Sequence, residues 1–139
     1  MARVRVHEAT SLNWLSVMDV AAPDLLPRLG EAEKASHVAF HEQGDAQSLQ
    51  LFEIAYEPGA DIEVHAHHED EIIYILGGSM KLGNRTVGPG SSLFVQGGTL
   101  YSFMAGPDGL KMLNFRARRD DSFITRDAFR TEYARTGRA

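Results

Sequence analysis

The stretch that decides the fold runs from Gly59 to Gly78 and reads GADIEVHAHHEDEIIYILGG. His65 and His67 are two residues apart, so on a β-strand their imidazoles project from the same face, with Cα atoms roughly 6.5–7 Å apart. A short polar turn follows, and Glu71 begins an apolar run that is typical of a second strand. Residues that flank a short antiparallel turn lie side by side. A carboxylate oxygen of Glu71 can therefore reach the same ion as the two imidazoles.

Two imidazoles and one carboxylate suit Fe(II), Mn(II), Ni(II), Zn(II) or Co(II). When the three side chains occupy one face of an octahedron, the open positions can take water, substrate or dioxygen. The same residue types also occur near strand turns as solvated polar side chains. That alternative leaves the spacing of the histidines, the glutamate and the flanking glycines without a cause. We therefore predict one divalent metal ion bound by His65, His67 and Glu71.

Five residues of this stretch match a family pattern at every fixed position. Gly59, His65, His67, Glu71 and Gly78 fit G(X)5HXH(X)3E(X)6G, the first motif of the cupin superfamily. The chain thus resembles a small single-domain cupin, a monocupin, that binds a metal. The resemblance implies an all-β fold, the double-stranded β-helix or jelly-roll barrel, with a metal at its mouth held by His65, His67 and Glu71.

The second cupin motif, G(X)5PXG(X)2H(X)3N, is present only in outline. Its two glycines are kept as Gly90 and Gly98. The proline position holds Gln96, the customary fourth ligand histidine is replaced by Tyr101, and the asparagine position holds Ala105. The fold signal survives these changes, but the metal coordination must differ from the family pattern.

Tyr101 has three possible roles. As a phenolate it could bind the metal directly. As a phenol it could donate a hydrogen bond to a metal-bound water or act as an acid or base, and we take it as the candidate catalytic residue. It could also fill the barrel beside Phe103, which would leave the metal with three protein ligands. His37, His41 and His68 are alternative sources of a fourth ligand.

Short strands separated by glycine-rich turns continue from residue 36 to residue 118 and predict an antiparallel barrel or sandwich. The expected strands are 36–42, 48–57, 61–66, 71–77, 79–82, 85–88, 92–95, 100–105 and 110–117. The apolar run after Glu71 implies burial on both faces of its strand. We divide the chain into an N-terminal extension (1–35), a cupin barrel (36–118) and a C-terminal helical tail (119–139).

The two flanking segments carry weaker patterns. Alternation in residues 3–7 (RVRVH) predicts a short edge strand, and the prolines between residues 19 and 34 predict a loop or one helical turn. Apolar spacing over 123–136 predicts a C-terminal helix, with a residue from 120–122 as its N-cap.

Side chains that alternate into the barrel predict a small aromatic and aliphatic pocket. The assigned residues are Phe52, Ile54 and Tyr56 on one strand, Ile73 on the face of Glu71, Phe103 on the face of Tyr101, and Arg116. An inward Arg116 could hold a substrate carboxylate, although arginine in such a position more often points outward. A pocket of this kind favours a small organic molecule over a polymer.

Bulk properties exclude several classes of partner and site. The 139 residues have a formal charge of -5 and a pI near 5.6, which argues against nucleic-acid or anionic-membrane binding. There is no cysteine, so disulfides and thiolate ligands are excluded. No apolar run approaches the ~20 residues needed to cross a bilayer, and no secretory signal is recognisable. A soluble cytoplasmic protein is expected.

These features predict a metal-dependent enzyme that acts on a small organic substrate. A His-His-Glu trio with Fe(II), favoured over Zn(II), Mn(II) and Ni(II), leaves positions for dioxygen and substrate, so a dioxygenase-type oxidoreductase is the first expectation. A metal-dependent lyase, isomerase or cyclase, and a non-enzymatic cupin that binds a small ligand, are the alternatives. By resemblance to other small cupins we also expect a homodimer, in which residues 3–7 extend the sheet of a second copy.

Overall fold

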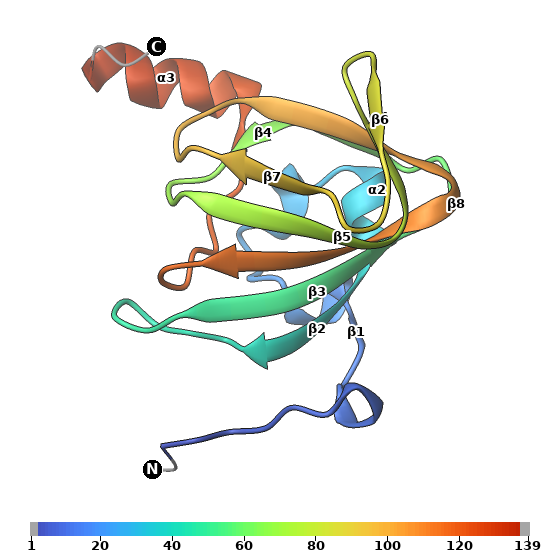
Figure 1. Ribbon diagram of the computed structural model, residues 1–139. Helices are drawn as coiled ribbons and strands as arrows, with labels where there is room; N and C mark the ends of the chain where they lie inside the picture. The colour runs from blue at the N-terminus through green and yellow to red at the C-terminus, as the bar shows by residue number, and fades with distance from the viewer. Residues whose placement is uncertain (1–2, 137–139) are drawn as a thin grey trace.

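Antiparallel strands enclose the interior of the molecule, and short helices lie at its N-terminal side and its C-terminal end (Figure 1). The computed structural model describes residues 3–136. In chain order the elements are η1 (Ala9–Ser11), β1 (Leu15–Ser16), α1 (Val17–Val20), η2 (Leu26–Arg28), α2 (Glu31–Lys34), β2 (His37–Glu42), β3 (Gln50–Tyr56), β4 (Asp61–Ala66), β5 (Glu71–Leu82), β6 (Arg85–Val87), β7 (Ser92–Val95), β8 (Tyr101–Arg116), β9 (Ile124–Thr125) and α3 (Arg126–Thr136). The predicted all-β class is confirmed.

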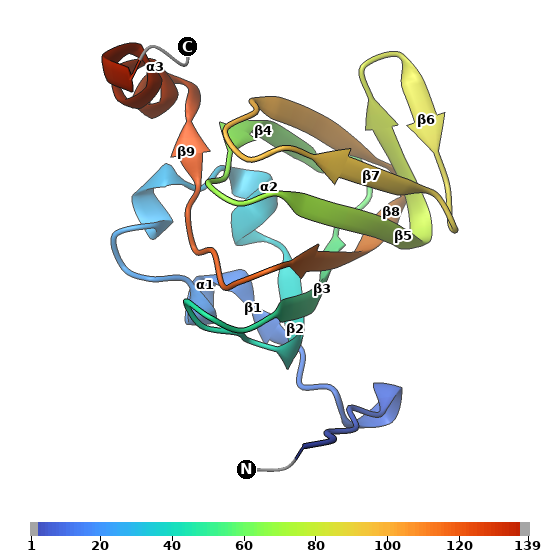
Figure 2. The ribbon, with the colours of Figure 1, turned by 60° about the vertical axis from the view of Figure 1, so that its left-hand side comes forward.

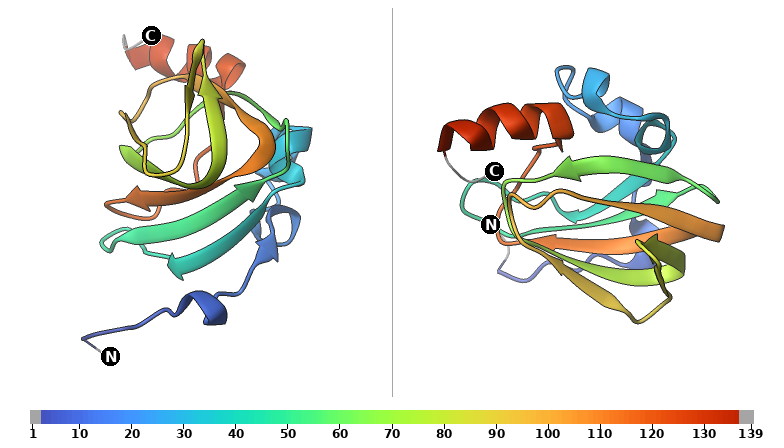
Figure 3. Two further views of the ribbon diagram at one scale, coloured as in Figure 1. Left: turned by 45° about the vertical axis from the view of Figure 1, so that its right-hand side comes forward. Right: turned by 90° about the horizontal axis from the view of Figure 1, so that it is seen from above.

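Two long strands, β5 and β8, belong to both layers of the barrel. Residues 72–78 of β5 pair with residues 110–115 of β8, whereas residues 80–81 of β5 pair with residues 104–105 of β8. β3 and β7 flank the first pairing, and β4 and β6 flank the second. The two layers face each other across the interior (Figure 3). This arrangement is the jelly-roll barrel that the sequence predicts.

The glycines at 77–78 and 106–109 bend these strands and do not end them. Gly78 has φ +69°, and a Cβ there would lie 2.0 Å from the carbonyl oxygen of Gly109. The bend of β5 therefore packs directly on the bend of β8, and only a residue without a side chain fits. The sequence had predicted turns at both places, with separate strands on either side. Each predicted pair is instead one continuous strand.

Side chains of β5 alternate between the interior and the outer surface. Ile73 and Ile75 are fully buried in the main core. Ile72 and Leu76 point outward and are 47% and 40% exposed. The expected burial on both faces of this strand is therefore wrong, because no element within residues 3–136 covers the outer face at these positions.

Residues 3–7 form no strand, so the predicted edge strand is wrong. No strand in the described chain pairs with these residues. The side chains of Arg5 and His7 are instead bonded to the carboxylate of Glu42 at the end of β2. The arm is attached to the barrel through side chains and not through a backbone ladder.

The rest of the extension and the tail join the barrel itself. β1 pairs with β2, and α1, η2 and α2 lie along one side of the barrel (Figure 2). At the other end, β9 pairs with His65 and Ala66 of β4, so the C-terminal helix begins at Arg126 and not at 123. The hydroxyl of Thr125 accepts a bond from the Ala128 N–H at 3.3 Å. Thr125 therefore takes the N-cap position that we had predicted for residues 120–122.

None of the helices that the structure describes is both long enough and apolar enough to cross a membrane.

Candidate functional site

The predicted site residues surround one cavity inside the barrel, with a volume of about 120 Å³. His65 lies in β4 and His67 directly after it, Glu71 begins β5, and Tyr101 begins β8. Five of the six predicted pocket residues also line the cavity: Phe52, Ile54, Tyr56, Phe103 and Arg116. Ile73 is not among the lining residues, and its fully buried side chain packs within the apolar core. That assignment is wrong.

Strand pairing fixes the position of His65. It lies opposite Tyr101 of β8 on one side and Thr125 of β9 on the other. Its ring stacks on the ring of Phe123, with centroids 4.6 Å apart and an interplanar angle of 9°, and the Tyr101 ring is also 4.6 Å away. His65 is 3% exposed. The imidazole is therefore held between two aromatic rings at the cavity wall.

Both imidazoles are oriented by backbone carbonyl groups. Nδ1 of His65 contacts the carbonyl oxygen of Glu63 at 2.7 Å, and Nδ1 of His67 contacts the carbonyl oxygen of Ser122. A carbonyl oxygen only accepts, so each Nδ1 carries the proton and each neutral ring has its lone pair on Nε2. Burial lowers the pKa of His65 and of His67 to about 4. Near neutral pH both rings are in the form that binds a metal.

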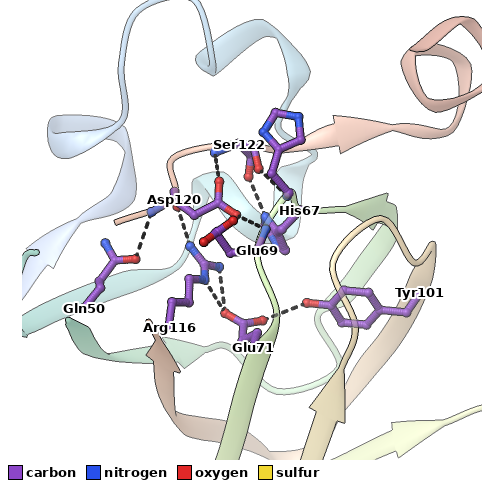
Figure 4. A network of polar contacts seen from close by, with 9 residues as sticks. Gln50, His67, Glu69, Glu71, Tyr101, Arg116, Asp120 and Ser122 are labelled. Atoms are coloured by element: carbon purple, nitrogen blue, oxygen red, sulfur yellow. Dashed lines mark hydrogen bonds and ion pairs between the residues drawn. The ribbon is translucent and has the colours of Figure 1, made fainter. Parts of the chain in front are cut away.

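Glu71 is held in a buried ion pair that the sequence did not reveal. Nε and a terminal nitrogen of Arg116 lie 2.8 and 2.7 Å from the same carboxylate oxygen, Oε2. The hydroxyl of Tyr101 donates to the other oxygen, Oε1, at 3.2 Å (Figure 4). Burial, together with the negative charge of Glu71, raises the pKa of Tyr101 well above its usual value. Tyr101 therefore stays protonated and acts as a hydrogen-bond donor.

Arg116 points inward and is 7% exposed, contrary to the commoner orientation. Its guanidinium group lies between the carboxylate of Glu71 and the backbone carbonyl of Asp120, to which it also donates (Figure 4). Two sides of the guanidinium group therefore already donate to acceptors of the protein. Its first role is to fix Glu71, and this partner was not among those that the sequence predicted for it.

The segment after β8 completes the site, and sequence reasoning missed it. The carboxylate of Asp120 accepts the backbone N–H groups of Glu69 and Ser122, each at 2.9 Å. Ser122 in turn supplies the carbonyl oxygen that orients His67. The bond from the Ser122 N–H back to Asp120 is an Asx turn, and the sequence Asp120-Asp121-Ser122 carried that signal. Phe123, which stacks on His65, has no comparable local signal.

The three other histidines proposed as fourth ligands lie away from the cavity. His41 bonds to Glu53 at 2.8 Å, and His68 bonds to Glu132 at 3.1 Å on the surface. His37 is exposed on β2. None of them lines the cavity, so Tyr101 is the only one of the proposed candidates that reaches it.

The cupin pattern implies a metal ion, and the two imidazoles fit one. They are neutral and carry free Nε2 lone pairs, and metal-binding histidines typically donate their other N–H to an acceptor as these do. Glu71 does not complete the trio in this arrangement, because both of its oxygens are bonded to other residues. Within residues 3–136, no three His, Cys, Asp or Glu side chains converge closely enough to hold an ion. His65 and His67 would therefore hold the metal, and Glu71 would join them through Oε1 only if the Tyr101 hydroxyl gave up its hydrogen bond to that oxygen.

No protein-family model matches the sequence, and no curated protein matches it. Solved structures do match. The polyketide cyclase RemF from Streptomyces resistomycificus has a TM-score of 0.62 and 23% identity, with 94% of this chain and 93% of that chain covered. An RmlC-like cupin from Ralstonia eutropha JMP134 has a TM-score of 0.65 and 12% identity, with 92% and 81% covered.

A third match is Bacillus subtilis oxalate decarboxylase, a protein with Mn(II) centres. Its TM-score is 0.56 at 19% identity, and the match covers 75% of this chain and 33% of that one. Identities this low establish the fold and not the reaction. The barrel topology, the strand positions of the motif residues and these matches agree on one architecture. The fold of the chain is thus the barrel of the solved cupin structures that it resembles.

Proposed function

We propose that the chain is a metal-dependent enzyme that transfers a proton on a small organic substrate, in a reaction of the cyclase, isomerase or lyase type. One observation carries this proposal. The Glu71 carboxylate is 2% exposed, faces the cavity, and is held by Arg116 on one oxygen and by the Tyr101 hydroxyl on the other. A carboxylate fixed in this way is suited to general-base catalysis. The architecture can carry such chemistry, because RemF, which shares the fold, is a cyclase.

Each side chain has a distinct role in this proposal. Glu71 accepts a proton from a carbon next to a carbonyl group, and Arg116 keeps the carboxylate in position while it does so. Tyr101, whose raised pKa keeps it protonated, would turn its hydroxyl from Oε1 of Glu71 to donate to a substrate oxygen. His65 and His67 would hold the divalent metal ion, which would supply Lewis-acid polarisation of the substrate carbonyl. Among the predicted candidates Fe(II), Zn(II), Mn(II) and Ni(II), Mn(II) gains support because the oxalate decarboxylase that shares the fold has Mn(II) centres.

The dioxygenase-type reaction with Fe(II) is the second candidate. It is favoured by the first-motif spacing, which brings Glu71 to the same cavity as the two histidines. That reaction needs a carboxylate oxygen of Glu71 as a metal ligand, whereas here Oε2 is bonded to Arg116 and Oε1 accepts from Tyr101. Glu71 must therefore give up at least the Tyr101 hydrogen bond before it binds the metal. We place proton transfer first because it uses the carboxylate as Arg116 holds it.

Solvent-deuterium exchange separates the two candidates. Wild-type protein loaded with Mn(II) or Fe(II) is incubated in deuterated water, without dioxygen, with β-diketones and hydroxyaryl ketones, and exchange at the acidic carbon is followed by NMR. We expect catalysed exchange, reduced roughly 100-fold or more by Glu71→Gln. Glu69→Gln, a neighbouring carboxylate paired with Arg118 outside the cavity, is the matched control and should leave the rate unchanged.

Two results would contradict the proposal. Dioxygen uptake with these substrates, without anaerobic exchange, would support the dioxygenase instead. Saturable binding of the ketones, without exchange or dioxygen uptake, would identify a non-enzymatic cupin that binds a small ligand.

A further inference from the structure

Two adjoining cavities occupy the barrel and its mouth. The inner one, of about 120 Å³, is the site described above, and the outer one has a volume of about 300 Å³. The residues common to both walls mark the passage between them: Val17, Phe52, Ile54, His67, Arg116 and Phe123. Sites for small organic molecules usually measure about 300–1,000 Å³. The two cavities together fall within this range, whereas the inner cavity alone does not.

Aromatic rings surround the inner cavity. Tyr101 and Phe103 are stacked with centroids 6.1 Å apart, and Tyr56 meets Phe103 edge-on at 5.7 Å. Phe52 and Phe123 complete this set of rings. An apolar cavity of about 150 Å³ in another protein is large enough to bind benzene. A volume of about 120 Å³ between aromatic walls therefore suits one six-membered ring and little more.

Two polar side chains in this wall, Glu33 and Asn114, have buried atoms without a hydrogen-bond partner in the described chain. Asn114 of β8 is 3% exposed and lines the inner cavity, and its Nδ2 forms no hydrogen bond within the described chain. In the inward row of β8 it follows Met112 and precedes Arg116, so it lies one step, roughly 7 Å, deeper than Arg116. A buried amide without a partner is unfavourable in the free protein, and a ligand that supplies an acceptor removes that penalty.

The outer cavity has a different character. The N-terminal extension supplies an apolar wall of Val17, Val20, Ala21 and Leu25. The barrel side adds Val38 and Phe40, while charged residues such as Arg119 and Asp121 belong to the same lining. The part of a ligand that extends through the passage into the outer cavity therefore meets apolar surface with a few charged groups beside it.

We propose that the site takes a molecule with one oxygen-bearing six-membered ring and an apolar extension. The ring enters the inner cavity and its hydroxyl or carbonyl oxygen accepts a hydrogen bond from Nδ2 of Asn114. The extension lies in the outer cavity against α1 and the loop that follows it. This inference deepens the proposed function and rests on it only in taking the cavity as the substrate site.

The first test uses the wild-type protein and three probes. Binding of 1-naphthol, naphthalene and phenol is measured by calorimetry or by NMR shifts. We expect 1-naphthol to bind about tenfold more tightly than naphthalene, which lacks the oxygen, and more tightly than phenol, which lacks the extension. Equal affinity for 1-naphthol and naphthalene would overturn the role of Asn114. This comparison needs no variant, so it does not depend on how a substitution affects folding.

Two variants then address the two cavities separately. Asn114→Leu should weaken 1-naphthol binding about tenfold, leave naphthalene binding unchanged, and raise the melting temperature of the free protein, because an unpartnered polar group is removed. A purely structural asparagine would instead give a lower melting temperature. Met80→Leu, a volume-conserving change in the core at a residue that lines neither cavity, is the control and should leave both affinities unchanged. Ala21→Phe should remove the advantage of 1-naphthol over phenol and leave phenol binding unchanged.

Failure of this inference is distinguishable from failure of the proposed function. Binding that depends on Asn114, without deuterium exchange, would support the proposed ligand class and contradict the proposed catalytic activity. Glu71-dependent exchange with ligands whose affinity is unchanged by both Asn114→Leu and Ala21→Phe would support the catalytic activity and contradict the ligand class.

Discussion

The two cavity histidines illustrate what a single residue position can and cannot reveal. Their shared orientation follows from a spacing of two on a strand, which is a local property that the sequence displays. The acceptor for His67, the carbonyl of Ser122, is 55 residues away along the chain and could not be predicted. Burial of both rings follows from that long-range packing. Their low pKa values are therefore a property of the fold and not of the motif.

These low pKa values predict a loss of stability in mild acid. The unfolded chain takes up protons on His65 and His67 as the pH falls through about 6.5, whereas the folded protein does so only near pH 4. Stability is thus fully present above pH 6.5 and decreases between pH 6.5 and 4. Urea denaturation of chelator-treated protein across this range measures it. His67→Gln should give a shallower decrease, and His37→Gln, which changes an exposed ring, should not. A wild-type profile that is flat between pH 6.5 and 4 would contradict the pKa values.

Arg116 was assigned correctly to the pocket, but its partner could not be predicted. Glu71 and Arg116 are separated by 45 residues and meet because β5 and β8 are neighbours in the sheet. Before that pairing is known, an inward arginine has several equally reasonable partners, including a substrate carboxylate. The same uncertainty concealed that both oxygens of Glu71 have protein partners.

The buried pair predicts a strongly non-additive pair of substitutions. Arg116→Met leaves the Glu71 carboxylate buried without its partner and should destabilise the protein by about 3–5 kcal/mol. Adding Glu71→Leu removes the stranded charge, so the double variant should be more stable than Arg116→Met alone. Denaturant unfolding measures all of these variants. If Arg116→Met costs less than about 1 kcal/mol, the ion pair does not have the burial described here.

At the scale of elements, the paired bends of β5 and β8 hold the two layers together. Gly78→Ala would place a methyl group 2.0 Å from a backbone oxygen at a left-handed φ of +69°. We expect a loss of at least about 2 kcal/mol, since strain and overlap add. Gly83→Ala is the matched control, because Gly83 also has a positive φ of 63° but faces open space. It should cost only about 1–2 kcal/mol. Equal losses by thermal or denaturant unfolding would show that the contact between the bends is unimportant.

The sequence predicted most element positions but misjudged how some of them end. Glycine marks both a turn and a bend, and only the partner strand distinguishes the two, so the breaks at 77–78 and 106–109 were misinterpreted. The helix over 123–136 began too early for a similar reason. Ile124 and Thr125 have helical spacing in the sequence, but the edge of β4 was available and they pair with it. Tertiary pairing outweighed the local preference in both cases.

At the scale of the whole molecule, one motif was enough to predict the barrel, and the rest of its surface was not predictable. The outer face of the layer containing β5, β7 and β8 carries large exposed side chains: Ile72, Tyr74, Leu76, Phe94 and Phe115. Ile72 lies opposite both Phe94 and Phe115 in the sheet, so three of them form one row. The apolar run after Glu71 had indicated burial on both faces of its strand. Hydrophobicity alone does not show which face another layer of the protein covers.

The homodimer stays a prediction, and this outer face is where we expect two copies to meet. Residues 3–7, which we first assigned to that contact, are held by Glu42 of their own chain. Contiguous exposed apolar surface commonly marks a protein contact. Sedimentation equilibrium should give twice the mass of one chain for the wild type and a single-chain mass for Phe94→Lys. A monomeric wild type, or a Phe94→Lys dimer of unchanged affinity, would contradict this assignment.

The central claim is that His65 and His67 hold the metal, while Glu71 pairs with Arg116 and accepts a proton from the substrate. Titration of Mn(II), followed by electron paramagnetic resonance, into the wild type, His67→Gln and the charge-neutral double variant Glu71→Gln/Arg116→Gln tests it most directly. The account predicts that His67→Gln weakens binding about 100-fold or more, while the double variant, folded by circular dichroism, stays within about tenfold of the wild type. A double variant that loses Mn(II) as completely as His67→Gln would show that Glu71 is a metal ligand and would contradict the account.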